Sequence, residues 1–237
     1  PWFIYFRFHY ECLFIYYIFN NSMIKISPSI LNVKTENIAS KVKKLDTAGA
    51  DYIHIDVMKG TYVDNISFNS DIVKEIKKIT SKVLDVHLMI KPIKPHLEEY
   101  INAGSDIITF HPEVENDPKG IIEFLKQNNI EAGIALHPKI NILDYKELFS
   151  IVDQIIVMTV IPGYGGQKFI ESQLNKINEL NELRKLKKYK FNISADGGIN
   201  HQSGRECIKN GVDVLAVGSF LLSKPETEFA KIINSFK

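Results

Sequence analysis

The stretch YIHIDVM, residues 52–58, is the part of the sequence that most directly indicates the fold. Successive side chains of a β-strand point to opposite sides, so His54, Asp56 and Met58 share one face of this run. The aliphatic residues between them share the other face, which we expect to pack against helices. This pattern favours a strand of a closed barrel whose helices lie outside and whose polar groups point inward.

Seven further strand-like runs occur along the chain, one before this stretch and six after it. From Met23 onward, short β-branched runs alternate with longer segments of helical period, which is typical of parallel α/β folds. The predicted strands cover 24–31, 51–58, 83–90, 106–110, 131–136, 154–160, 191–196 and 213–217. The predicted helices cover 36–48, 70–80, 95–103, 118–128, 142–149, 171–188, 202–210 and 226–236. Eight such pairs predict a (β/α)8 TIM barrel.

The turns between these elements indicate one domain. The pattern Ala48-Gly49-Ala50-Asp51 returns as Ala103-Gly104-Ser105-Asp106, and no Pro-, Ser- or Gly-rich linker separates two halves. A doubly wound open sheet is the alternative, but it would need a glycine fingerprint after the first strand, and IKISPSILN has none. We therefore expect one barrel domain over 23–237.

Residues 1–22 differ from the rest of the chain in being crowded with Phe, Tyr and Ile. The uninterrupted apolar stretch 12–19 is shorter than the ~20 residues that span a bilayer, so we expect no membrane anchor. We expect this segment to be sequence carried over from upstream or introduced in cloning, or else a leader.

Composition excludes several classes of function. The 29 basic and 28 acidic residues leave a net charge of +1, and no long basic run supplies a nucleic-acid surface. Cys12 and Cys207 are far apart and lack a CxxC or CxxH arrangement, so neither a disulfide framework nor a thiolate zinc site is indicated. We expect a cytoplasmic protein without a nucleic-acid partner.

Polar residues concentrate near the carboxyl ends of the predicted strands, where barrel active sites are built. By the same parity, the inward residues include Ser27, Ser29, Leu31, Asp85, His87, Met89, Ser194 and Asp196. Two histidines and two carboxylates of this set have the ligand types of a zinc, iron, manganese or cobalt site. We predict that the metal ligands are His54, Asp56, His87 and Asp196.

Other residues near the same rim fit a small-molecule site. Met58, Met89 and Met158 are either plain barrel filling or a soft, water-excluding layer beside the charged groups. Glycine-rich loops follow predicted strands six to eight and favour a phosphate site, because glycine lets backbone N–H groups approach an anion. In the first loop, Tyr164 and Gln167 fit a flexible lid equally well. We expect His111 and His137 to be rim residues rather than ligands.

These residues resemble the ribulose-phosphate 3-epimerase family over essentially the whole chain from Ile24. The motifs that carry the resemblance are Pro28-Ser29-Ile30-Leu31, His54-Ile55-Asp56-Val57-Met58, Val86-His87-Leu88-Met89, Val157-Met158-Thr159-Val160, the loop from Pro162 to Phe169, and Asp196-Gly197-Gly198-Ile199. The resemblance implies a barrel of the ribulose-phosphate-binding type. It also implies metal-dependent interconversion of D-ribulose 5-phosphate and D-xylulose 5-phosphate at C3, through an enediolate, in the non-oxidative pentose phosphate pathway.

The resemblance also implies roles for individual residues. His54, Asp56, His87 and Asp196 would hold the metal, with zinc expected first and Fe2+, Mn2+ or Co2+ as alternatives. Asp56 would be the proton acceptor and Asp196 the proton donor. The substrate contacts would be Ser29, His87, Gly163, Tyr164, Gly165, Gly166, Gly197, Gly198, Gly218 and Ser219. A homo-oligomer, dimer or hexamer, is expected from the family alone.

Lys59, Asp64 and Ile161 depart from the family pattern, and none of them is a proposed ligand or acid-base group. Three alternatives stay open. The first is an epimerase for a six-carbon phosphate such as allulose 6-phosphate, because the depth of the substrate pocket cannot be read from the sequence. A related barrel decarboxylase or aldolase is the second; the decarboxylase would need a strand-end lysine interleaved with aspartates, whereas the parity of Lys59 points it away from the site. A noncatalytic sugar-phosphate-binding barrel would share the fold.

Overall fold

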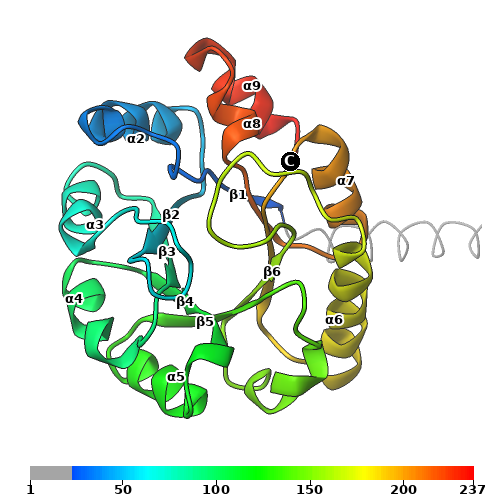
Figure 1. Ribbon diagram of the computed structural model, residues 1–237. Coiled ribbons are helices and arrows are strands. Elements are labelled where there is room, and N and C mark those ends of the chain that lie inside the picture. Colours follow the sequence, from blue (N-terminus) through cyan, green and yellow to red (C-terminus); the bar gives the residue numbers. More distant parts are fainter. Residues whose placement is uncertain (1–22) are drawn as a thin grey trace, which may run out of the picture.

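A computed structural model describes residues 23–237, and the expectations for residues 1–22 lie outside the described residues. Eight parallel strands form a nearly closed barrel with helices around it, in the order β1-β8-β7-β6-β5-β4-β3-β2 (Figure 1). This confirms the predicted TIM barrel and rules out the open doubly wound sheet. Within the described part of the chain, no helix is long and apolar enough to cross a membrane.

The elements alternate along the chain as predicted, and the first and last strands are the shortest. The strands are β1 (Lys25–Ser27), β2 (Tyr52–Met58), β3 (Val83–Met89), β4 (Ile107–Phe110), β5 (Glu131–Leu136), β6 (Gln154–Met158), β7 (Asn192–Asp196) and β8 (Val214–Ala216). The α-helices are α2 (Ile38–Thr47), α3 (Ser70–Lys77), α4 (Leu97–Asn102), α5 (Pro118–Gln127), α6 (Gln173–Lys187), α7 (His201–Lys209), α8 (Ser219–Leu222) and α9 (Phe229–Asn234). The 3-10 helices are η1 (Thr35–Asn37), η2 (Lys94–His96), η3 (Pro112–Val114), η4 (Ile142–Leu148) and η5 (Glu226–Glu228).

Strand β1 ends earlier than the predicted range 24–31 because Pro28 has no N–H to donate to a ladder. The chain nevertheless continues beside β2. The N–H of His54 donates to the carbonyl of Pro28 at 3.0 Å, and the N–H of Ile30 donates to the carbonyl of His54 at 3.2 Å. A bridge between Ser29 and His54 thus draws the two ends of the sheet together, and it brings the Ser29 side chain next to β2.

The structure differs from the prediction in two segments. The range 142–149 is the 3-10 helix η4, which is kinked at Tyr145. Residues after β8 were expected to form a glycine loop, but the short helix α8 begins at Ser219, directly after Gly218. In both places a few local hydrogen bonds determine the backbone conformation. The periodicity of hydrophobic residues does not distinguish elements this short.

The strand parity predicted for residues 52–58 is confirmed. Ile53, Ile55 and Val57 are fully buried in the hydrophobic layer between the strands and the helices. His54 and Asp56 lie on the opposite face of β2, inside the barrel, where they meet side chains from other strands. The polar residues therefore end up inside the barrel and the main hydrophobic core outside it.

The repeated Gly-x-Asp turns support the amino-terminal end of the barrel, away from the polar strand ends. The carboxylate of Asp51 accepts a hydrogen bond from the N–H of Ile26 at 2.8 Å, and that of Asp106 accepts one from the N–H of Leu84 at 2.8 Å. Asp213 does the same for the N–H of Ile193 at 2.7 Å. Each aspartate joins its own strand to the preceding one, so the repeat is explained by barrel assembly.

Candidate active site

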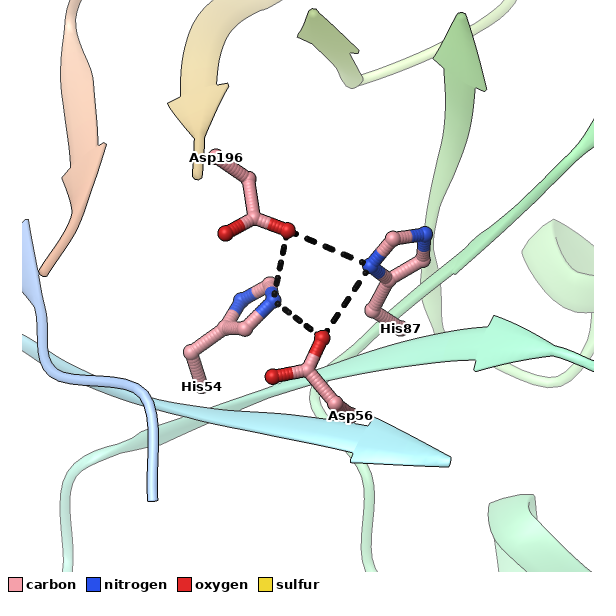
Figure 2. A group of neighbouring side chains, drawn as sticks. All are labelled: His54, Asp56, His87 and Asp196. Atoms are coloured by element: carbon pink, nitrogen blue, oxygen red, sulfur yellow. Dashed lines mark ion pairs between the residues drawn. The ribbon is translucent and has the colours of Figure 1, made fainter. Parts of the chain in front are cut away.

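The carboxyl ends of three strands bring four side chains to one point inside the barrel. His54 and Asp56 come from β2, His87 from β3 and Asp196 from the last position of β7, and all four point toward a common centre (Figure 2). Asp56 and His87 are neighbours because β2 and β3 pair in that register. Asp196 arrives from the other side of the barrel, so the closure of the sheet is what completes the group.

The facing atoms of this group lie at ion-pair distances. Nε2 of His54 is 3.3 Å from Oδ1 of Asp56 and 3.7 Å from Oδ2 of Asp196. Nδ1 of His87 is 3.4 Å from the same Asp56 oxygen and 3.6 Å from the same Asp196 oxygen. Both nitrogens are buried, and among the described residues neither has a partner with hydrogen-bond geometry. Four polar atoms therefore surround one point without satisfying one another.

A divalent metal ion fits this arrangement. The four atoms lie within 4.8 Å of one another. Tetrahedral bonds of about 2.0–2.2 Å would place neighbouring ligand atoms about 3.3–3.6 Å apart, close to the measured separations of histidine and carboxylate atoms. The two buried ring nitrogens that lack hydrogen-bond partners would each gain a partner. The cluster predicted from the sequence is therefore brought together, and it could hold a metal ion.

The electrostatics of the cluster follow from its burial and from its opposite charges. Burial lowers the pKa of His54, but the charges of Asp56 and Asp85 outweigh it and hold that pKa well above 6.5. Burial likewise opposes the charged form of His87, while Asp196 and Asp56 raise its pKa. For both carboxyls burial raises the pKa, but the neighbouring histidines dominate and lower it. A metal ion entering the site would displace protons from the histidines.

Two further side chains orient His54 and Asp56, the two β2 residues of the cluster. Nδ1 of His54 is 2.7 Å from Oδ2 of the fully buried Asp85, which leaves Nε2 facing the cluster. Asp85 is itself held by the amide of Gln154, whose Nε2 donates to Oδ1 at 3.0 Å. The hydroxyl of Ser29 donates to Oδ2 of Asp56 at 2.8 Å, so the other carboxylate oxygen is the one that faces the histidines.

His111 lies outside the cluster, as expected, but the expectation that it is at the rim is wrong. His111 is fully buried, and its Nε2 lies 3.1 Å from Nε2 of His87. It follows the last residue of β4 and keeps the parity of Thr109, so it points into the barrel behind His87. Applying the parity argument to β4 as to the other strands would have found it. His137 is partly exposed, and its Nδ1 accepts a hydrogen bond from the N–H of Lys139 at 3.1 Å, as expected of a rim residue.

Sequence reasoning missed two hydroxyls that fix the carboxyl ends of β2 and β7. The Ser67 hydroxyl donates to the carbonyl of Asp56 at 2.5 Å and accepts from the N–H of Met58 at 2.9 Å. The Thr159 hydroxyl lies 2.9 Å from the carbonyl of Asp196 and 2.6 Å from that of Gly197. Both bind backbone rather than ligand side chains, and no pattern of residue types marks such contacts in a sequence.

A cavity of about 230 Å³ opens above Asp56 and Asp196. It is below the ~300–1,000 Å³ of drug-sized pockets, which favours a small metabolite. Met58, Met89 and Met158 are among the residues that line it. The predicted substrate residues that line it are Ser29, Gly163, Tyr164, Gly165, Gly166, Gly197, Gly198, Gly218 and Ser219. His87, also predicted to contact the substrate, is fully buried and does not line this cavity.

The glycine loops approach one another too closely for side chains. Gly198 has φ +65°, and a Cβ there would lie 2.6 Å from the backbone nitrogen of Phe169. A Cβ on Gly165 would lie 2.7 Å from Nδ2 of Asn32, which itself donates to the hydroxyl of Ser219 at 2.9 Å. Asn32, which the sequence did not single out, thus joins the loops that follow β6 and β8.

The departures from the family pattern lie away from the cluster. Nζ of Lys59 is 2.9 Å from Oε1 of Glu99 and 3.0 Å from Nδ1 of His96, on the side of α4. This confirms that Lys59 points away from the site, and the lysine required of a decarboxylase is not supplied by this residue. Ile161 is partly exposed on the loop before Gly163.

Comparisons with known proteins agree on one family. The ribulose-phosphate 3 epimerase family model matches residues 25–222. The chain is 35% identical over 209 residues to the ribulose-phosphate 3-epimerase of Bacillus subtilis, covering 88% of this chain and 96% of that one. It is 32% identical over 216 residues to the enzyme of the same name from Escherichia coli, covering 90% and 94%. A mutant tryptophan synthase α-subunit from Pyrococcus furiosus superposes with a TM-score of 0.67 at 14% identity, covering 90% and 98%, and shows the shared fold only.

Proposed function

The chain belongs to the ribulose-phosphate 3-epimerase family, and on this premise we propose that it interconverts D-ribulose 5-phosphate and D-xylulose 5-phosphate. The observation that carries the proposal is the meeting of two buried carboxylates, Asp56 and Asp196, beneath a cavity of metabolite size. The reaction belongs to the non-oxidative branch of the pentose phosphate pathway. Family membership makes the chain an epimerase, and the roles of its residues are our proposal.

Inversion of a carbon next to a carbonyl requires that one group remove its proton and a second group return a proton to the other face. Asp56 and Asp196 come from β2 and β7, so they reach the substrate position from two sides. We assign Asp56 as the proton acceptor and Asp196 as the proton donor. The lowered pKa of Asp56 keeps it ionised at neutral pH, as a base must be. Ser29 fixes the orientation of its carboxylate through the 2.8 Å hydrogen bond.

A divalent ion is proposed to be held by Nε2 of His54, Nδ1 of His87 and one oxygen each of Asp56 and Asp196. When bound, it would polarise the substrate carbonyl as a Lewis acid and offset the charge of the enediolate. Two imidazoles and two carboxylates suit zinc, which we propose first, and also Fe2+, Mn2+ and Co2+. The three methionines of the cavity would exclude water above the two carboxylates.

The phosphate is proposed to bind at the glycine loops of the cavity. The residues of these loops that line it are Gly163 to Gly166, Gly197, Gly198, Gly218 and Ser219. Glycine there would let backbone N–H groups approach an anion. Asn32 would hold the loops together through Ser219. Tyr164 is mostly exposed at the cavity mouth, which fits a residue that covers the bound substrate.

The test is a coupled assay of ribulose 5-phosphate turnover, run with and without a chelator, with incorporation of solvent deuterium at C3 followed in parallel. We expect turnover and exchange in the metal-loaded chain, loss of both on chelation, and recovery on adding back metal. Turnover of allulose 6-phosphate in preference to the pentose would assign the six-carbon reaction instead. Metal binding without turnover of either sugar would indicate the noncatalytic barrel.

The remaining assignments are also proposals. A cytoplasmic location is supported by the lack of a disulfide pattern in the sequence and is tested by fractionation of the cells that make the chain. A homo-oligomer, dimer or hexamer, is proposed from the family and is tested by the molar mass in solution from light scattering. Residues 23–237 are proposed as one catalytic domain, and limited proteolysis should leave that fragment intact.

A further inference from the structure

We propose that His111, Glu113 and Tyr62 form a hydrogen-bond relay that holds the His87 ring with Nδ1 toward the metal ion and so sets the metal affinity of the site. The inference rests on the proposed function, because it takes His87 as a metal ligand. These three are positioning residues: none of them belongs to the cluster of facing ligand atoms.

The relay follows from the protons on the two rings. If Nδ1 of His87 binds a metal ion through its lone pair, the ring proton must be on Nε2. That N–H then donates to Nε2 of His111, 3.1 Å away, which must carry no proton. The proton of His111 is therefore on Nδ1. This nitrogen faces Oε1 of Glu113 at 3.3 Å and the hydroxyl of Tyr62 at 3.2 Å, both of which can accept.

Tyr62 and Glu113 complete the relay. The Tyr62 hydroxyl donates to Oε1 of Glu113 at 2.8 Å, so its own lone pairs are free to accept from His111. The Tyr62 ring also packs on His111, with centroids 4.6 Å apart. Along this series of hydrogen bonds, each donor has its acceptor on the side away from the cluster. Donation therefore runs outward, from His87 to the Glu113 carboxylate. The arrangement therefore selects one tautomer for each ring.

The environment of His111 supports the neutral form that the relay needs. Its ring is fully buried, which disfavours a positively charged imidazolium there. A protonated His111 would have no lone pair to offer to His87, and it would oppose a positive ion nearby. The other proposed histidine ligand is treated differently: His54 meets the Asp85 carboxylate directly, at 2.7 Å. In proteins the residues that orient metal-bound histidines contribute about 10–100-fold in metal affinity.

The test measures binding of Co2+ alone to the metal-free full chain, by its visible absorption and by calorimetry. We expect His111→Leu, which removes the acceptor, to weaken Co2+ binding by about 10–100-fold and to alter the absorption bands. His111→Gln can place its amide oxygen near the position of Nε2, so it should recover most of the affinity. Glu113→Leu should weaken binding while leaving the His111 ring in place. Tyr62→Phe should weaken it less, since Oε1 of Glu113 still lies 3.3 Å from Nδ1 of His111.

Tyr100→Phe is the matched control for Tyr62→Phe. Tyr100 is fully buried on α4, and among the described residues its hydroxyl has no hydrogen-bond partner. This variant should bind Co2+ as the unmodified chain does. Unchanged affinity and spectrum in folded His111→Leu would overturn the relay. If that variant does not fold, unchanged affinity in Glu113→Leu would overturn it equally. Failure of the unmodified chain to bind Co2+ would contradict the proposed function itself.

Discussion

Nδ1 of His54 lies 2.7 Å from Oδ2 of Asp85, and both side chains are fully buried inside the barrel. This contact decides which nitrogen of His54 faces the cluster. Asp85 was placed on the inner face by its parity in the sequence, but its partner was unknown. A carboxylate behind a metal-bound histidine fixes the ring and increases its basicity.

We expect Asp85→Asn to weaken metal binding by about 10–100-fold, because the amide orients His54 less strongly and removes a buried negative charge. Metal titration by calorimetry measures this. Asp106→Asn is the control, since Asp106 supports the backbone of Leu84 at the opposite end of the barrel. It should lower the melting temperature without changing metal affinity. Equal metal affinities for Asp85→Asn and the unmodified chain would contradict the role of Asp85.

Asp56 and Asp196 are proposed both to bind the metal and to move a proton. Asp56→Asn and Asp196→Asn should therefore each reduce metal affinity, and at saturating metal each should still lose about 10²–10⁴-fold in kcat. Deuterium incorporation at C3 should fall with kcat in both. Ser29→Ala removes only the hydrogen bond that orients Asp56, so it should cost less. Near-normal exchange in either asparagine variant at saturating metal would exclude the scheme with two carboxylates.

Gly198→Ala should be more damaging than Gly49→Ala, although both glycines have positive φ. At Gly49 an added Cβ meets nothing within 4 Å, so backbone strain of about 1–3 kcal/mol is the main cost. At Gly198 the Cβ would also lie 2.6 Å from the backbone of Phe169 and would displace the proposed phosphate loop. Melting curves and KM measure the two effects. Only Gly198→Ala should raise KM.

Metal affinity should rise with pH near neutrality, because the raised pKa values of His54 and His87 require the ion to displace protons. Without metal, the histidine contribution to stability is complete below pH 6.5 and is lost as pH rises through the raised pKa values. The contribution of Asp56 and Asp196 is present above their ordinary pKa of 3.8 and is lost as pH falls through the lowered values. Calorimetry in buffers of different ionisation enthalpy should detect proton release, and a constant affinity from pH 6 to pH 8 would contradict it.

Cys207 should not react with thiol reagents in the folded chain. It is fully buried on α7, and burial raises its pKa to about 12, so very little thiolate forms at neutral pH. A Cys12→Ser variant isolates this thiol, which should react with Ellman's reagent only after unfolding. Rapid reaction of the native variant would show that the packing around α7 opens.

The sequence by itself determined the barrel and the four residues of the candidate metal cluster. Alternation along residues 52–58 assigns His54 and Asp56 to one face, and the same counting applies to His87 and Asp196, since strand parity is a local property of the backbone. The eight-fold alternation of strands and helices then limits the topology to one ring. Each of these inferences needs only the residue types in a short segment and the periodicity with which they recur.

Only the tertiary structure decided which atoms meet. The pairing of Asp56 with His87 depends on the register of β2 and β3, and Asp196 reaches them because the sheet closes. The positions of His111 behind His87 and of Thr159 beneath Asp196 depend on distances across the barrel. Such contacts join residues far apart in the chain, and no local period encodes them. The chemistry of the candidate site was therefore readable in the sequence, whereas the supports that orient it were fixed by the closing of the barrel.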